Sequence, residues 1–157
     1  MPAVQGRAAG FIATLYRVAT VITDKSEANI EAAIIDANEV IDVSSMGALS
    51  RERAIIDIPV YGQDVAGKLA GQADPGTFDF TVTLNLNDAQ HVSIRDNTGR
   101  LENTFIIRYE QSTANTTYAA FDGFLANASV TQAIDGAIAM ECSVARSGDV
   151  TWIDNST

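Results

Sequence analysis

The most specific chemical motif in this sequence is the glycine-rich segment at residues 62–68, G-Q-D-V-A-G-K. It matches the first seven positions of a P-loop, in which backbone amides and a lysine hold phosphates and a following Ser or Thr binds Mg²⁺. Leu69 stands where that hydroxyl should be. The Gly and Pro residues up to Gly76 also prevent the helix whose N-terminus would face the phosphates. We therefore interpret residues 62–68 as loop with one basic residue.

The sequence contains one histidine, His91, and one cysteine, Cys142. A catalytic histidine needs a nucleophile and an orienting carboxylate, but Ser93 is two residues away and points elsewhere on a helix. Cys142 lies on the apolar side of a predicted strand, with no neighbouring His or Lys to activate it. The 20 acidic residues single out no catalytic pair. We predict that the protein is not an enzyme and has no cofactor or metal, that His91 is a surface or hydrogen-bonded histidine, and that Cys142 is a buried structural thiol.

The charge balance excludes several classes of protein. Twenty acids against ten bases give a net charge of −10, which argues against a sequence-independent grip on nucleic acid. One cysteine allows no intrachain disulfide and no multi-cysteine metal site. No apolar run reaches the length of a membrane span, so no membrane anchor is expected. The N-terminus lacks a strong basic region before its apolar run, so we expect no secretory signal and synthesis inside the cell.

The elements that must position these residues are mostly strands. Val and Ile total 27 residues against 7 Leu, and β-branched side chains favour pleated sheets. The clearest alternation runs through residues 77–86, where Phe78, Phe80 and Val82 share one face. Short helices are predicted within 24–38 and 88–95. Further strands are predicted at 11–22, 39–45, 51–61, 104–110, 117–126, 136–146 and 150–153.

These elements predict a mostly β protein, a β-sandwich or open barrel flanked by one or two short helices. Residues 1–10 lack periodicity and are predicted to form an extended N-terminal arm before a single domain at 11–157. Pro59 places the strand at 51–61 at a sheet edge. Residues 62–76 contain four Gly and few large apolar side chains, and are predicted to be a long flexible loop.

The order of these segments resembles a known family. Residues 40–46 (V-I-D-V-S-S-M) precede 54–61 (A-I-I-D-I-P-V-Y), and the polar loop ends in G-Q-A-D-P-G just before F-D-F-T-V-T-L at 78–84. A strand with F-D-G-F at 121–124 and a terminal segment with A-R-S-G-D-V-T-W at 145–152 follow. Together they resemble the major tail tube protein of long, non-contractile (siphovirus-type) phage tails, over roughly residues 10–153. Some members add an immunoglobulin-like domain at the C-terminus, and the resemblance is to those without it.

The resemblance implies a structural virion protein, made in the host bacterial cytoplasm, that forms hexameric rings stacked into a tail tube. Four strands per subunit would give 24 per ring, with a backbone diameter of about 37 Å at about 4.8 Å per strand. Double-stranded DNA would pass through the lumen without specific binding. The implied partners are other copies of the chain and the tape-measure, tail-tip and terminator proteins. The N-terminal arm and the segment near 45–76 would make ring-to-ring contacts.

An acidic wall would repel passing DNA, whereas Lys or Arg contacts would slow it. Acids on the polar side of predicted strands are the lumen-facing candidates: Asp57, Asp79, Asp122 and Glu141. Charges in the segment assigned to stacking are the ring-stacking candidates: Arg51, Arg53, Lys68 and Asp74.

Two other functions fit the same sequence. One is the tube protein of a related machine, a type VI secretion system or a gene-transfer particle, which shares the fold. The other is a β-barrel module that binds a small ligand, which would be a stable monomer with a preformed pocket.

Overall fold

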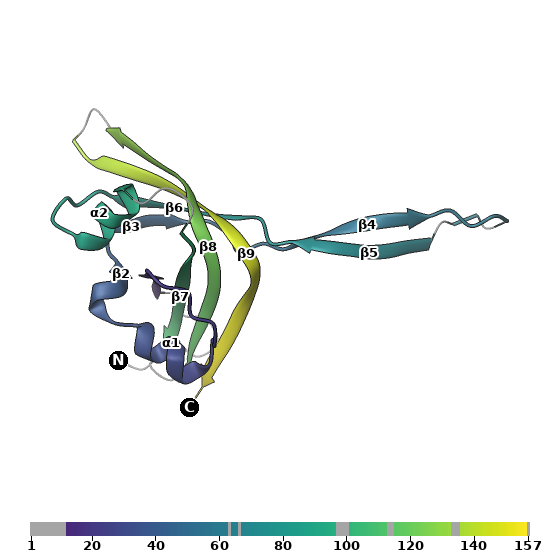
Figure 1. Ribbon diagram of the computed structural model, residues 1–157, viewed down its shortest axis with the longest axis horizontal. Helices are drawn as coiled ribbons and strands as arrows, with labels where there is room; N and C mark the ends of the chain where they lie inside the picture. Colours follow the sequence, from purple (N-terminus) through teal and green to yellow (C-terminus); the bar gives the residue numbers. More distant parts are fainter. Residues whose placement is uncertain are drawn as a thin grey trace.

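The computed structural model describes residues 12–62, 64–65, 67–96, 101–112, 115–132 and 136–156. Seven strands form one antiparallel sheet in the order β2-β1-β7-β8-β9-β6-β3, and β4 pairs with β5 in a separate ribbon that extends away from the rest of the molecule (Figure 1). The elements are β1 (Ile12–Val18), α1 (Glu27–Ala33), the 3-10 turn η1 (Asp36–Asn38), β2 (Glu39–Val40), β3 (Val43–Met46), β4 (Glu52–Ile58), β5 (Gly67–Asp74), β6 (Thr77–Thr83), α2 (Ala89–Asp96), β7 (Asn103–Ser112), β8 (Asn115–Gln132) and β9 (Ile138–Ser156).

Two very long strands, β8 and β9, join the two halves of the sheet. The first half of β8 pairs with β7 as far as Gly123, whereas residues 124–132 pair only with β9. The sheet turns where Ala120 pairs with Thr151 but Asp122 pairs with Ser147, so three β9 residues bulge opposite one of β8. A Cβ on Gly123 would lie 2.6 Å from the Ala145 carbonyl oxygen, so this close crossing requires glycine.

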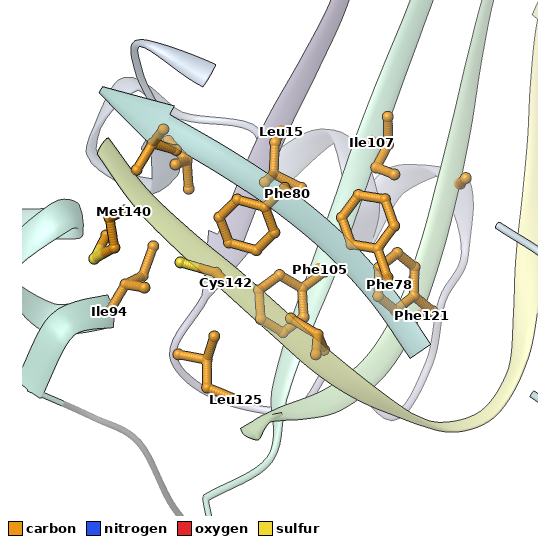
Figure 2. Close-up of a cluster of buried hydrophobic side chains, with 14 residues drawn as sticks. Leu15, Phe78, Phe80, Ile94, Phe105, Ile107, Phe121, Leu125, Met140 and Cys142 are labelled. Carbon is orange, nitrogen blue, oxygen red and sulfur yellow. The ribbon is translucent and has the colours of Figure 1, made fainter. Parts of the chain in front are cut away.

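The main core fills the inside of the bent sheet. Phe78 packs edge-on against Phe121 with ring centroids 5.4 Å apart, and Phe105 stacks on Phe121 at 5.7 Å (Figure 2). Ile94 of α2 closes one side of this cluster. A smaller cluster forms where Ile30 of α1 packs against the opposite face of β1, β7 and β8. One side of the sheet is thus covered by its own fold, and α1 covers the other side at β1, β7 and the first half of β8.

The fold is mostly β with two short helices, as predicted. The N-terminal helix is shorter than expected: Ser26 caps it, its hydroxyl accepting the Asn29 amide at 3.5 Å, and it ends at Ala33. The predicted strand at 150–153 is the end of β9, which continues through Gly148 at φ 86°. No helix in the described part of the chain is long and apolar enough to cross a membrane.

The predicted flexible loop at 62–76 is wrong, because residues 67–74 form β5. This strand has few large apolar side chains and follows no clear alternation, yet its backbone pairs with β4 from Ile58–Gly67 to Glu52–Asp74. The predicted N-terminal arm at 1–10 lies outside the described residues.

Candidate assembly surfaces

The first candidate surface is the outward face of the half-sheet made by β3, β6, β9 and the second half of β8. The register places Asp79 beside Ser143, and Glu141 beside Thr81 on one side and Ser129 on the other. Asp79 and Glu141 are both exposed and line the same shallow hollow. Thr77 and Thr83, which lie on the same side of β6 as Asp79, are exposed as well. It is a polar, acidic face directly opposite the apolar core.

The two edges of this half-sheet are open. In the described part of the chain, no strand pairs with the outer side of β3 or with the side of residues 124–132 that faces away from β9. Each neighbouring pair in the order β8, β9, β6, β3 is antiparallel, so β8 and β3 run in opposite directions. The outer edge of β3 in one copy therefore has the right direction to pair antiparallel with β8 of a second copy.

The third surface is the hairpin, residues 52–74. All seven residues of β4 are exposed, and Tyr61 near its tip is fully exposed. Ile56 pairs with Leu69, and both side chains remain more than half exposed, at 52% and 54%. Ile58 shares their face because strand side chains alternate. The opposite face carries an ion pair between Lys68 and Asp57 at 3.3 Å. The hairpin thus has one apolar face, at Ile56, Ile58 and Leu69, and one charged face that also carries exposed Ile55, with neither buried.

All four ring-stacking candidates lie on the hairpin or at its root. Arg51 pairs with Asp149 of β9 at 2.9 Å, and Arg53 donates to the Gly71 carbonyl at 3.3 Å. Lys68 pairs with Asp57, and the Asp74 carboxylate accepts the Gly76 amide at 2.9 Å. Whether these groups stack rings stays a prediction.

The four lumen-facing candidates do not lie on one surface. Asp79 and Glu141 share the outward polar face, whereas Asp57 lies on the hairpin. Asp122 lies on the α1 side of the sheet, mostly buried, where it accepts bonds from Lys25 at 2.9 Å and from the Thr104 hydroxyl at 2.8 Å. Asp122 is committed to contacts inside its own chain, and only Asp79 and Glu141 remain together as candidates for one wall.

Lys68, His91 and Cys142 were considered above for phosphate binding or catalysis, and their surroundings favour structural roles instead. Lys68 lies in a strand, so the P-loop-like segment has no helix after it. His91 is buried, with Nδ1 accepting the Asn85 amide and Nε2 bonded to the Ile41 carbonyl at 2.7 Å. Burial raises the pKa of the Cys142 thiol to about 12, so it stays protonated at neutral pH.

Two buried arginines, Arg17 and Arg146, were not predicted from the sequence. Arg17 donates to Gln90 and Ser93 of α2, and burial lowers the pKa of its guanidinium. Arg146 donates to the carbonyl oxygens of Ser50 and Pro75, and burial lowers its pKa against the opposing effect of nearby acids. One signal was available: the apolar alternation 138, 140, 142, 144 places residue 146 on the inward side.

No family model and no curated protein matches this sequence. Among solved structures, the chain is similar to one from the six-fold symmetrised cryo-EM structure of the anti-feeding prophage baseplate. The alignment covers 96% of this chain and 97% of that one, with a TM-score of 0.68 and 9% sequence identity. The two chains share a fold.

Proposed function

We propose that this chain is a ring-forming subunit of a phage tail or tail-like particle, and that its rings stack into a tube. The observation that carries this proposal is the four-stranded half-sheet with two open, oppositely directed edges. Open edges invite pairing with another chain, and closure of a barrel removes them. The fold shared with a chain of a six-fold symmetrised prophage baseplate supports six copies per ring. Six copies of four strands give the 24-stranded barrel of about 37 Å backbone diameter.

The polar face of the half-sheet becomes the lumen wall in this arrangement. The inner face of β6 already carries Phe78, Phe80 and Val82 in the core, so only the face with Asp79 and Glu141 is available. Six copies carry 6 × −10 = −60 charges per ring. The residues that β6 and the paired part of β9 place on this face include no arginine or lysine, so the wall lacks the cations that would hold phosphates and slow transit.

The hairpin is the ring-to-ring contact in this proposal. It presents an apolar face around Ile56 and Leu69 that has no partner within the described residues of its own chain. We assign to the chain no catalytic residue and no cofactor. More specifically, we propose a siphovirus-type tail tube in the virion, with tape-measure, tail-tip and terminator proteins as partners. The second candidate is the tube of a related machine, which the resemblance to a baseplate chain favours.

Negative-stain electron microscopy of the full chain, over a range of concentrations at low and high salt, tests the proposal. We expect hollow rings or tubes. A stable monomer at every concentration that binds a small ligand in a preformed pocket would instead support the ligand-binding module.

Two single variants, Ser129→Pro and Val130→Pro, test the edge itself. Consecutive amides of a strand point to opposite edges, so one proline removes a β8–β9 bond and the other removes a donor only at the open edge. The open-edge variant is the one whose circular dichroism and melting temperature match the parent. We expect that variant to stay monomeric, and normal tubes from it contradict edge joining.

A further inference from the structure

The root of the hairpin is held to the sheet by one buried side chain. Arg146 of β9 is 7% exposed, and a single nitrogen, Nη2, donates to the carbonyls of Ser50 and Pro75. These two residues flank the hairpin, one just before β4 and the other just after β5. The guanidinium thus ties together the point where the chain leaves the body and the point where it returns.

The guanidinium of Arg146 also contacts the core of the body. Its carbon lies 6.0 Å from the ring centroid of Phe121, at the centre of the main core. The backbone amide of Arg146 also donates to the Gly76 carbonyl at 3.1 Å. Three residues further on, the β9 bulge presents Asp149 to Arg51, and the two form a third, exposed contact with the hairpin root at 2.9 Å. All three contacts come from one short stretch of β9.

Apart from these contacts, the segment before β4 is held by the Gly47 amide, which donates to the Asp79 carbonyl at 2.6 Å, and by Leu49, which packs against the main core. Residues 47–50 belong to no strand, and Gly76 adopts a left-handed backbone at φ 74° on the return side. Two buried donors of Arg146, Nε and Nη1, have no hydrogen-bond partner among the described residues. A buried cation with an incomplete set of bonds adds little net stability. Its contacts do, however, fix a direction for the ribbon that leaves the body there.

We propose that Arg146 is a positioning residue that sets the direction of the hairpin and thereby prepares it to dock on a second copy of the chain. The docking half of this inference rests on the proposed tube function. The hairpin keeps its own β4–β5 ladder without Arg146, but its root becomes a hinge. Without Arg146 the hairpin samples many directions, and only one of them fits the docking site on the second copy. Assembly is therefore weakened in proportion to the time that the hairpin spends in the other directions.

A distance measurement in the monomer tests the positioning half without any assembly. Spin labels are attached at Tyr61→Cys near the hairpin tip and Leu86→Cys on the body, both of which replace exposed residues. Cys142 is buried with a pKa of about 12 and stays unlabelled at pH 7, which mass spectrometry verifies. We expect a narrow distance distribution in the parent, at least about twice that width in Arg146→Met, and an intermediate width in Arg146→Lys. The control Arg95→Met removes an exposed arginine of α2 and should leave the width unchanged.

A distribution as narrow in Arg146→Met as in the parent overturns the proposal. Arg146→Met keeps an apolar stem against Phe121, so we expect its melting temperature to match the parent; if it fails to fold, Arg146→Lys carries the test. For docking, a hairpin correctly directed a tenth of the time raises the concentration needed for tubes about tenfold. A broad distribution with unchanged assembly overturns the docking half. A parent that never assembles refutes the tube function, while the distance widths still decide the role of Arg146.

Discussion

Two strands of the same length, β6 and β4, place their apolar side chains in opposite environments. β6 buries Phe78, Phe80 and Val82 almost completely, each at 2% exposure or less. β4 carries Ile55, Ile56 and Ile58, and leaves them 68%, 52% and 37% exposed. Both strands are seven residues long, and both pair antiparallel with a neighbour. The difference is therefore in what covers the side chains, not in the strands themselves.

This contrast separates the residues that fold the chain from those available to a partner. Each large apolar side chain buried in β6 stabilises the fold by about 1.5–3 kcal/mol, and the same residues on β4 contribute little in the monomer. Contiguous exposed apolar surface on a soluble protein commonly marks an interaction site. The β4–β5 hairpin is thus a region whose hydrophobic stabilisation becomes available on association.

Phe121→Ala should have the largest effect on the folded chain. Phe121 contacts Phe78 and Phe105 and lies beneath Arg146, so its loss leaves a cavity at the centre of the core. We expect a loss of about 3–5 kcal/mol in the free energy of unfolding, measured by urea denaturation of the monomer. Phe124→Ala, three residues along the same strand at a side chain 39% exposed, is the matched control. Equal losses in the two variants contradict the division between core and surface on β8.

Ile56→Ser with Leu69→Ser should have the opposite effect to Phe121→Ala: it should prevent assembly and leave the stability of the folded chain almost unchanged. These side chains pair on the apolar face of the hairpin and support nothing in the body, so the free energy of unfolding should change by no more than about 0.5 kcal/mol. We expect loss of sedimentable tubes, because the docking face becomes polar. Ile55→Ser with Ala70→Ser alters the cross-strand pair on the charged face. Tubes that survive the first pair and disappear with the second reverse the assignment of the docking face.

The same contrast explains what the sequence could predict. The alternation of 77–86 gave β6 and its inward residues, because a strand with one buried face has a period of two. Apart from Leu69, the side chains of β5 are small, polar or charged, and six of its eight residues are exposed, so burial leaves no pattern to read. Its strand character comes from backbone pairing with β4, which a residue-by-residue pattern does not reveal.

The candidate site was predictable to a similar extent. Alternation indicated that Asp79 and Glu141 lie on the polar side of their strands, and both are exposed on one face. The same rule placed Asp122 on a polar side, but α1 and the segment before it cover that side and supply Lys25. The partner is 97 residues away, and such a contact depends on tertiary structure. Arg146 was missed because its inward position has meaning only once the hairpin root is seen beside it.

Asp122→Asn should have an intermediate effect. It removes a mostly buried charge that pairs with Lys25 and accepts a bond from Thr104. We expect a loss of about 1–3 kcal/mol in the free energy of unfolding, since Lys25 is left without its anion. Asp79→Asn, on the exposed polar face, should change it by no more than about 0.5 kcal/mol. Urea denaturation of both variants distinguishes an acid used for folding from one left on the surface.

Of the hairpin variants, charge reversal at the root should have the smaller effect on assembly. Arg51 and Asp149 are 49% and 63% exposed, so their ion pair contributes at most about 1 kcal/mol to folding. We expect Arg51→Glu with Arg53→Glu to fold normally and to need a few-fold higher concentration to form tubes at low salt. The difference should shrink at high salt, since screening weakens contacts between exposed charges. The double variant Arg51→Asp with Asp149→Arg exchanges the two charges and so keeps an ion pair. It should recover part of the assembly that Arg51→Glu with Arg53→Glu loses. If Arg51→Glu with Arg53→Glu forms normal-length tubes at low salt, these charges play no part in stacking. The apolar face of the hairpin is then the contact that drives stacking.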